Sequence, residues 1–344
     1  MYADDIAFAT QGKCFKQIER SLTRDRTTFK SFCNHWRLNP STTKTESSCF
    51  HLNNREARST LKVYMGDHLL VHNLTPNYLG VTLDRTLSFK QHLMKLRGKL
   101  ATRNNILRKL TASSWGSNAS TLRTSALSLV YSTAEYCSPV WINSCHTSLV
   151  DTQLNSTMRV VSGTVRSTPT PWLPVLSDIA PPDLRRKNAL LREYQNAINS
   201  PNMPLHDDLQ LPPPYRLKSR HPPLVSAVNL INNHFSVNKV WSETWSQSQF
   251  NSPLFEFRKN RKAEFKLSRR CWVNLNRLRT QHGCCGEMLQ KWRIKDDPSC
   301  PCGNPLQSIE HIMRDCPLTK YPGNIEDISE LSSLTVDWLK TLKL

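Results

Sequence analysis

Apolar residues recur at helical spacing in several parts of the chain. From residue 13 to residue 36 they lie on one stripe, which predicts a helix with one face against a core. That stripe is Phe15, Ile18, Leu22, Phe29, Phe32 and Trp36. A second seam, from residue 85 to residue 110, consists of Phe89, Leu93, Leu96, Leu100, Leu107 and Leu110. Further helices are expected near residues 120–131, 149–162 and 325–342.

Short β-like runs lie between the first two predicted helices, near residues 48–52, 61–65, 69–71 and 78–83. Gly66-Asp67 separates two of these runs and predicts a tight hairpin turn. Residues 201–223 contain seven prolines, including Pro212-Pro213-Pro214, and predict an extended linker. The pattern as a whole predicts an α+β protein, with a mixed region at 1–84, a helical region at 85–200, the linker at 201–223 and a mostly helical region at 224–344.

Composition adds a strong charge imbalance to this picture. The chain has 344 residues, too many for one small domain. Its 46 Lys and Arg residues exceed its 27 Asp and Glu residues by 19, which favours a polyanionic partner. No apolar run is long enough to span a membrane, and no secretory signal opens the chain, so we expect an intracellular protein without a membrane partner. The basic run RKNRK at 258–262 could serve as a nuclear localisation signal.

The positive charge is concentrated around the second predicted helix. Residues 85–134 contain nine Lys or Arg residues and no carboxylate. A solvated helix face is the alternative explanation, but fifty residues without one acid favour contact with phosphates. The candidate nucleic-acid-binding residues are Lys90, Lys95, Arg97, Lys99, Arg103, Arg108 and Lys109. A second basic run, at 258–270, has seven cations against Glu264 alone.

A candidate zinc site lies near the C-terminus. The segment SCPCGNPLQSIEHIMRDCP places Cys300, Cys302, His311 and Cys316 within seventeen residues. Three thiolates and one imidazole complete the tetrahedral shell that structural zinc prefers. Gly303 would let the chain turn back toward the metal, and the site would stabilise a segment with little core of its own. A disulfide or scattered core cysteines are the alternatives, and a Cys300–Cys302 disulfide would have poor geometry.

Two adjacent aspartates, Asp4 and Asp5, stand between apolar residues near the N-terminus. Their mutual repulsion makes a purely structural role unfavourable, and a bound Mg²⁺ would relieve it. Carboxylates of this kind hold the paired ions of nucleotidyl transfer. They are the candidate catalytic residues of the chain. No P-loop, H-E-x-x-H or G-x-S-x-G motif is present.

The motif YADDIAF at 2–8 resembles the signature turn of reverse transcriptases. The following segments resemble, in order, those of non-LTR retrotransposon reverse transcriptases of the LINE or jockey-like type. They are Trp36 with Leu38-Asn39-Pro40 and Lys44-Thr45, Tyr78-Leu79-Gly80-Val81 with Leu83-Asp84, the stretch WLPVLSDIAPPDLRR at 172–186, and Cys302-Gly303 with His311 and Cys316. The resemblance therefore covers most of the chain.

The resemblance implies an RNA-directed DNA polymerase that uses Mg²⁺. Asp4 would ligate the ion and Asp5 would support it. Residues 1–84 would be part of the palm and 85–200 the thumb and connection, and 224–344 would bind nucleic acid with a zinc knuckle at 300–316. The implied partners are an RNA template, a DNA primer and their hybrid. Protein partners are not implied.

The chain departs from this family at its N-terminus. A reverse transcriptase has fingers and a third palm carboxylate before YADD, whereas only Met1 precedes it here. We therefore expect the C-terminal part of a retrotransposon polymerase, inactive by itself. The alternative is a non-enzymatic nucleic-acid-binding zinc-knuckle protein derived from such an element, in which Asp4 and Asp5 are relics. A zinc-dependent structural protein without a nucleic-acid partner is a third hypothesis.

Overall fold

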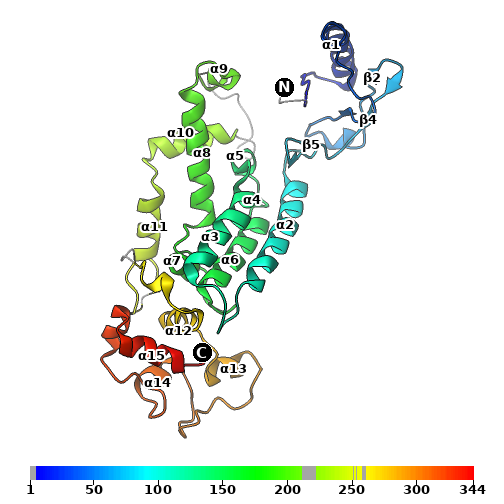
Figure 1. Cartoon of the computed structure of the whole chain (residues 1–344). Helices are drawn as coiled ribbons and strands as arrows, with labels where there is room; N and C mark the ends of the chain where they lie inside the picture. The colour runs from blue at the N-terminus through cyan, green and yellow to red at the C-terminus, as the bar shows by residue number, and fades with distance from the viewer. Residues whose placement is uncertain (1–4, 211–221, 251, 253, 258–260) are drawn as a thin grey trace. The chain divides into compact units, whose positions relative to one another are not determined.

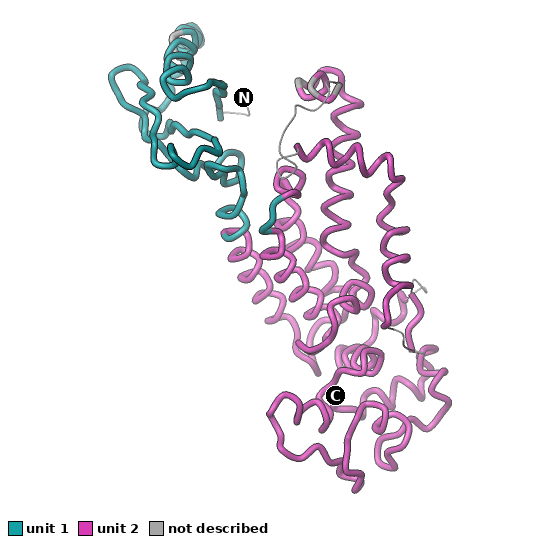
Figure 2. The backbone as a smooth tube through the Cα atoms, turned by 180° about the vertical axis from the view of Figure 1, so that it is seen from behind, with its two compact units in different colours: residues 1–94, 144–146 teal, residues 95–143, 147–344 magenta. Residues whose placement is uncertain are grey.

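The structure, a computed structural model, describes residues 5–210, 222–250, 252, 254–257 and 261–344. It divides into two compact units (Figures 1 and 2). Unit 1 comprises residues 1–94 with 144–146, and unit 2 comprises residues 95–143 with 147–344. Helices dominate and strands are few, which confirms the predicted α+β class. No helix among the described residues is both long enough and apolar enough to cross a bilayer.

Unit 1 combines one long helix with short strand pairs. Its elements are α1 (Phe15–His35), β1 (Glu46–Ser47), η1 (Asn54–Glu56), β2 (Tyr64–Met65), β3 (His68–Leu69), β4 (Val71–His72), β5 (Asn77–Tyr78) and β6 (Val81–Thr82). β1 pairs in parallel with β4, whereas β2–β3 and β5–β6 are antiparallel hairpins. The hairpin predicted at Gly66-Asp67 is confirmed. The run expected at 78–83 instead turns at Leu79-Gly80, and the run at 48–52 is not a strand.

The apolar stripe of α1 is only partly covered. The helix forms as predicted, but Phe32 and Trp36 are 44% and 62% exposed, and only Cys33 of the helix is buried among its described side chains. The expectation that this stripe faces a core is therefore wrong for its C-terminal half. Two-residue strands offer too little surface to cover a 21-residue helix.

Unit 2 is a set of helices whose elements follow one another through the rest of the chain. They are α2 (Lys90–Lys109, which starts in unit 1), α3 (Ala119–Ala126), η2 (Leu127–Tyr131), α4 (Ser132–Glu135), α5 (Ser138–Trp141), α6 (Ser148–Ser162), α7 (Trp172–Ser177), α8 (Pro182–Ile198), α9 (Pro204–Gln210), α10 (Pro223–Asn232), α11 (Val237–Ser246), η4 (Glu264–Lys266), α12 (Arg269–Thr280), α13 (Gly286–Lys291), α14 (Ile309–Arg314), η5 (Ile325–Glu330) and α15 (Ser333–Thr341).

The leucine seam of α2 is buried as its spacing predicts. Leu93, Leu96, Leu100 and Leu107 are at most 5% exposed, although Leu110, past the helix end, is 39% exposed. Within unit 2 a buried polar pair joins α2 to α6. The Asn104 side chain donates to the Gln153 carbonyl at 3.0 Å and accepts from the Thr157 hydroxyl at 2.6 Å. This satisfied amide fixes the register of the two helices.

Helix α12 attaches the C-terminal part of unit 2 to the end of α6. The last carbonyls of a helix lack partners within it. Here Arg269 donates to the carbonyls of Val160 and Val161, and further α12 side chains donate to those of Ser162 and Gly163. Gly163 has φ +72°, and a Cβ there would lie 2.3 Å from Val273 Cγ2. Only glycine therefore permits this approach.

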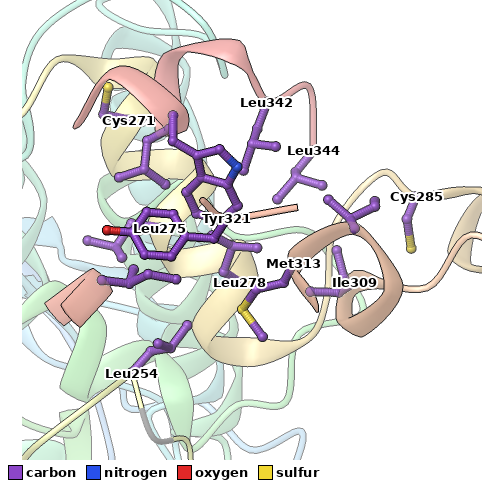
Figure 3. Packing of buried hydrophobic residues seen from close by; sticks show 14 of the residues in the cluster. Leu254, Cys271, Leu275, Leu278, Cys285, Ile309, Met313, Tyr321, Leu342 and Leu344 are labelled. Atoms are coloured by element: carbon purple, nitrogen blue, oxygen red, sulfur yellow. The ribbon is translucent and has the colours of Figure 1, made fainter. Parts of the chain in front are cut away.

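A hydrophobic core lies between α12, α14 and α15 (Figure 3). Leu275 and Leu278 of α12 meet Ile309 and Met313 of α14 in this core, together with Leu339 of α15. The expectation that the zinc-site segment has little core of its own is therefore only partly right, because α14 adds three buried side chains to a larger cluster.

Two predicted elements differ from the structure. Residues 201–223 are not uniformly extended, since Pro204 and Pro223 open α9 and α10 at the first helical position, where proline loses no hydrogen bond. Pro212-Pro213-Pro214 lies outside the described residues. The helix expected over 325–342 is two elements, η5 and α15, because Leu331 has φ +56° and breaks the helical path.

Candidate metal centre and basic surfaces

A tight turn presents Cys300 and Cys302. The Gly303 amide donates to the Cys300 carbonyl at 2.9 Å, and the Cys300 amide donates to the Asn304 carbonyl at 2.8 Å. Gly303 has φ +93°, a conformation open to glycine and rarely to other residues. The turn that the sequence predicts after Cys302 is therefore present.

Helix α14 presents His311 and leads to Cys316. It starts after Ser308, whose hydroxyl accepts from the His311 amide at 3.0 Å. Beyond its end, the Cys316 amide donates to the His311 carbonyl at 2.8 Å. This bond folds the chain back, so that the fourth ligand lies beside the third.

The four side chains meet at spacings that a tetrahedral ion would impose. Cys300 Sγ lies 3.7 Å from Cys316 Sγ, and Cys302 Sγ lies 3.3 Å from His311 Nε2. All four ligand atoms lie within 4.8 Å of one another. A tetrahedral zinc with the usual bond lengths separates two sulfurs by about 3.8 Å and a sulfur from a nitrogen by about 3.6 Å. The residues present therefore fit zinc.

Burial and hydrogen bonds suit the cluster to a structural role. Cys300, His311 and Cys316 are buried and Cys302 is half-buried. Burial raises the pKa of the Cys316 thiol, but hydrogen bonds, including one with Thr319, outweigh it and lower that pKa to about 6. The Gln307 side-chain amide lies 3.6 Å from Cys300 Sγ. Gln307 is a supporting residue that sequence reasoning missed, because only the folded turn brings it to the sulfur.

The other cysteines do not join this cluster. All eleven are unpaired, which argues against the disulfide alternative. Cys284 is exposed and Cys285 is buried in the adjacent core. Both therefore lie outside the ligand set, as their adjacency in the sequence predicts.

Most candidate nucleic-acid-binding residues of α2 are accessible. Six of the seven are exposed, namely Lys90, Lys95, Arg97, Lys99, Arg108 and Lys109. Arg103 is half-buried and donates to the Leu129 carbonyl. Arg108 donates to Asn105 at 2.7 Å and to Ser156 at 2.8 Å. Within unit 2, Lys95, Arg97, Lys99 and Lys109 are also exposed.

Two arginines of the second basic run have structural roles. Arg261 is 9% exposed and donates to the carbonyls of Val175 and Leu176 at the end of α7 and to Glu264. Arg269 is 5% exposed, and burial lowers its pKa to about 10. These two arginines are therefore not part of an accessible cationic surface, because carbonyls at the ends of α7 and α6 accept their hydrogen bonds. Arg258, Lys259 and Asn260 lie outside the described residues.

The predicted catalytic pair is only partly described. Asp5 is exposed, and residues 6–10 form no strand. Asp4, the candidate Mg²⁺ ligand, lies outside the described residues. The catalytic role of both aspartates remains a prediction.

The resemblance to non-LTR retrotransposon polymerases is confirmed by the relatives of the chain. It is 25% identical to the Retrovirus-related Pol polyprotein from type-1 retrotransposable element R1 of Bradysia coprophila, over 74% of this chain and 24% of the relative. It is 22% identical to the R1 2 polyprotein of Nasonia vitripennis, over 95% of this chain and 80% of the relative. It is 30% identical to the probable RNA-directed DNA polymerase from transposon BS of Drosophila melanogaster, over 41% of this chain and 15% of the relative.

The chain thus spans about a quarter of the Bradysia polyprotein and four fifths of the Nasonia one. No protein-family model matches it. No solved structure is significantly similar to it.

Proposed function

We propose that this chain, a homologue of non-LTR retrotransposon polymerases, is a nucleic-acid-binding portion of an RNA-directed DNA polymerase. The alignment with the Nasonia polyprotein over 95% of the chain carries the proposal. In it, Asp4 and Asp5 hold Mg²⁺ for nucleotidyl transfer, unit 1 is part of the palm, α2 and the following helices are the thumb, and the C-terminal region binds nucleic acid.

The Cys/His cluster supports a zinc knuckle in this polymerase. Cys300, Cys302, His311 and Cys316 would hold the ion, and the ion would stabilise the turn and α14. The exposed residues around the cluster would then have a fixed arrangement for contact with a template or primer.

The exposed cations of α2 would contact phosphates of the template–primer hybrid. Replacing Lys95, Arg97 and Lys99 together with glutamine is expected to weaken binding of an RNA–DNA hybrid and reduce its salt dependence. Each lost phosphate contact lowers the slope of log affinity against log salt by about 0.9 on a duplex. Fluorescence anisotropy at several salt concentrations measures this slope.

Three other exposed or half-exposed cations, Lys187, Arg192 and Lys239 on α8 and α11, form a matched control. Replacing them removes the same charge without altering α2. Equal salt slopes for the two triple variants would show that α2 has no special role in binding.

The 344-residue polypeptide by itself is expected not to extend a primer. Family polymerases hold their ions with a further carboxylate from an earlier palm strand, and the sequence of this polypeptide contains no equivalent segment. A primer-extension assay with purified protein, Mg²⁺ and an RNA template measures the activity. Extension that disappears in Asp4→Asn would contradict the expectation of inactivity and establish the catalytic role.

The non-enzymatic alternative keeps the basic helix and the knuckle but treats the aspartates as relics. The six exposed cations of α2 favour nucleic-acid binding under both hypotheses. Primer extension by this polypeptide would exclude the alternative, whereas no extension is expected under both hypotheses, and binding measurements do not separate them either.

A further inference from the structure

A cationic cleft lies within unit 1, away from the residues that the motifs single out. It has a volume of about 520 Å³ and lies between α1 and the segment that leads into β2. Lys16, Arg20 and Arg24 of α1 line it, together with Lys62 and Tyr64. Glu19 is its single acid.

The three α1 cations form a regular array. They are four residues apart, so their Cα atoms rise by about 6 Å per step along one helix face. All three side chains are exposed, as is that of Lys62 on the opposite wall. An array of this length matches several phosphates along a strand better than it matches one isolated anion.

The charge of the cleft is only weakly compensated. Glu19 accepts from the backbone amide of Lys62 at 2.7 Å, a bond that joins the two walls. Lys16, Arg20 and Lys62 form no ion pair with any residue the structure describes, and Arg24 pairs only with the half-buried Asp25, at 3.7 Å. Like charges at i, i+4 destabilise a helix, so a bound polyanion would relieve repulsion among them.

An aromatic ring adjoins the cations. Tyr64 is 45% exposed and lies on β2 at the edge of the cleft. Cations that follow a backbone, combined with an exposed ring on which a base can stack, are the two elements of single-strand recognition.

We propose that this cleft binds a single strand of nucleic acid, with Lys16, Arg20, Arg24 and Lys62 on the phosphates and Tyr64 stacked on a base. The inference rests on the proposed nucleic-acid binding and adds a second contact surface to that of α2. The exposed ring of Tyr64 favours a strand with unstacked bases over a duplex. RNA and DNA share the phosphodiester chemistry, and the experiment distinguishes between them.

The test replaces Lys16, Arg20 and Lys62 with glutamine in the full chain. Affinity for labelled 20-nucleotide RNA and DNA strands is measured over a series of salt concentrations. Three lost contacts at about 0.7 each should reduce the slope of log affinity against log salt by about 2. Lys30, Arg55 and Arg58, exposed cations of unit 1 outside the cleft, form the control triple, which should leave the slope nearly unchanged.

Tyr64 gives an independent measurement. Tyr64→Ala should weaken single-strand binding about tenfold, whereas Tyr64→Phe, which keeps the ring, should bind as the parent does. A strand that carries 5-iodouridine should crosslink to the peptide containing Tyr64. A larger effect of the cleft variant on RNA than on DNA would identify RNA as the preferred strand.

The outcomes separate this inference from the function on which it rests. If the α2 triple variant loses affinity while the cleft triple behaves like its control, the cleft proposal is overturned and the proposed function stands. If the parent chain binds no nucleic acid, the proposed function fails first. Equal losses of single-strand and duplex binding in the cleft variant would overturn the preference for a single strand.

Discussion

Cys302→Ser is expected to abolish stoichiometric zinc binding and to unfold the turn at 299–304 together with α14. The parent chain should carry one zinc per molecule, since four soft ligands already lie at tetrahedral spacing. Structural zinc contributes roughly 10–16 kcal/mol in zinc-finger peptides, so losing one ligand should exceed the effect of an ordinary core substitution. Elemental analysis and amide hydrogen exchange measure the two effects.

The exchange pattern should be regional. The amides of Cys300 and Gly303, which are bonded within the turn, and that of Cys316, which is bonded to the His311 carbonyl, should lose protection. The bundle formed by α2, α3 and α6 should keep it, because its contacts are made by other side chains. Cys284→Ser is the matched control, as Cys284 is exposed and outside the ligand set. Freshly purified parent protein without metal would disprove the zinc assignment.

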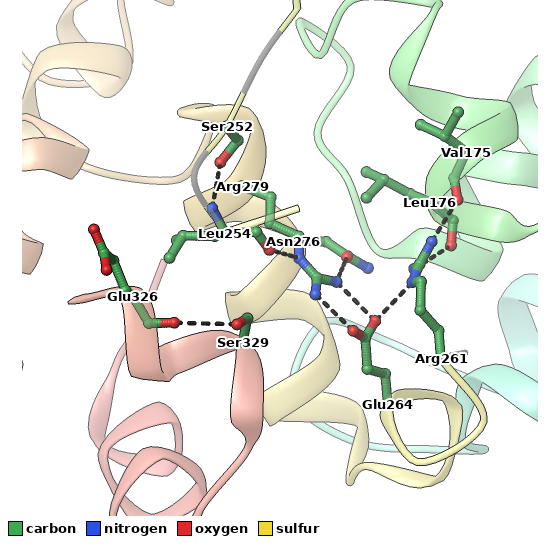
Figure 4. Close-up of polar contacts among 10 residues, drawn as sticks. All are labelled: Val175, Leu176, Ser252, Leu254, Arg261, Glu264, Asn276, Arg279, Glu326 and Ser329. Carbon is green, nitrogen blue, oxygen red and sulfur yellow. Dashed lines mark hydrogen bonds and ion pairs between the residues drawn. The ribbon is translucent and has the colours of Figure 1, made fainter. Parts of the chain in front are cut away.

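Glu264→Gln is expected to destabilise unit 2 by about 3–5 kcal/mol, the usual cost of removing one partner of a buried ion pair. Figure 4 shows the Glu264 carboxylate between two arginines. Arg279 donates to both of its oxygens, at 2.8 and 2.9 Å, and Arg261 donates at 2.7 Å. The neutral amide would remove the carboxylate with which both buried guanidinium groups pair. Urea unfolding measures the loss.

The same carboxylate predicts a pH dependence. Burial raises the pKa of Glu264, but Arg279 and Arg261 outweigh it and hold that pKa below its ordinary value of 4.5. A lowered folded-state pKa means that the stabilisation is fully present above pH 4.5 and is lost as the pH falls through the folded-state value. Glu264→Gln should therefore flatten the stability profile on the acid side.

Asp337→Asn provides the control for this measurement. Asp337 pairs with Lys340, but its side chain is 71% exposed, so water screens the pair. Its loss should change stability by less than about 1 kcal/mol. If Glu264→Gln changed the free energy of unfolding as little as Asp337→Asn, the prediction would be wrong. The carbonyl contacts of Arg261 and Arg279 would then be sufficient for these buried side chains.

The local sequence pattern predicted secondary-structure elements correctly where interactions within a few residues decide their formation. The stripe of α1, the leucine seam of α2 and the Gly66-Asp67 hairpin form where the sequence indicates, since spacing and turn chemistry act within a few residues. The four candidate metal ligands were also identifiable from the sequence, because all of them lie in one short segment whose turn and helix bring them together. The exposure of part of the apolar face of α1 could not be predicted from the sequence, because it depends on how other elements pack against the helix.

Charge was the least informative pattern by itself. The basic runs at 85–110 and 258–270 look alike in the sequence, yet the first is mostly exposed and the second contains two buried arginines. An arginine side chain is buried where hydrogen-bond acceptors are available for the N–H groups of its planar guanidinium. For Arg269 these are carbonyls more than a hundred residues away along the chain.

Short-range spacing and ordered motifs were enough to predict helices α1, α2 and α6, the candidate Cys/His cluster and the relation to retrotransposon polymerases. The solvent exposure of individual cations, the attachment of α12 to α6, and the position of Lys62 across a cleft from α1 became evident only from the three-dimensional structure. These features depend on contacts between residues far apart in the sequence, and a local sequence pattern does not specify such contacts.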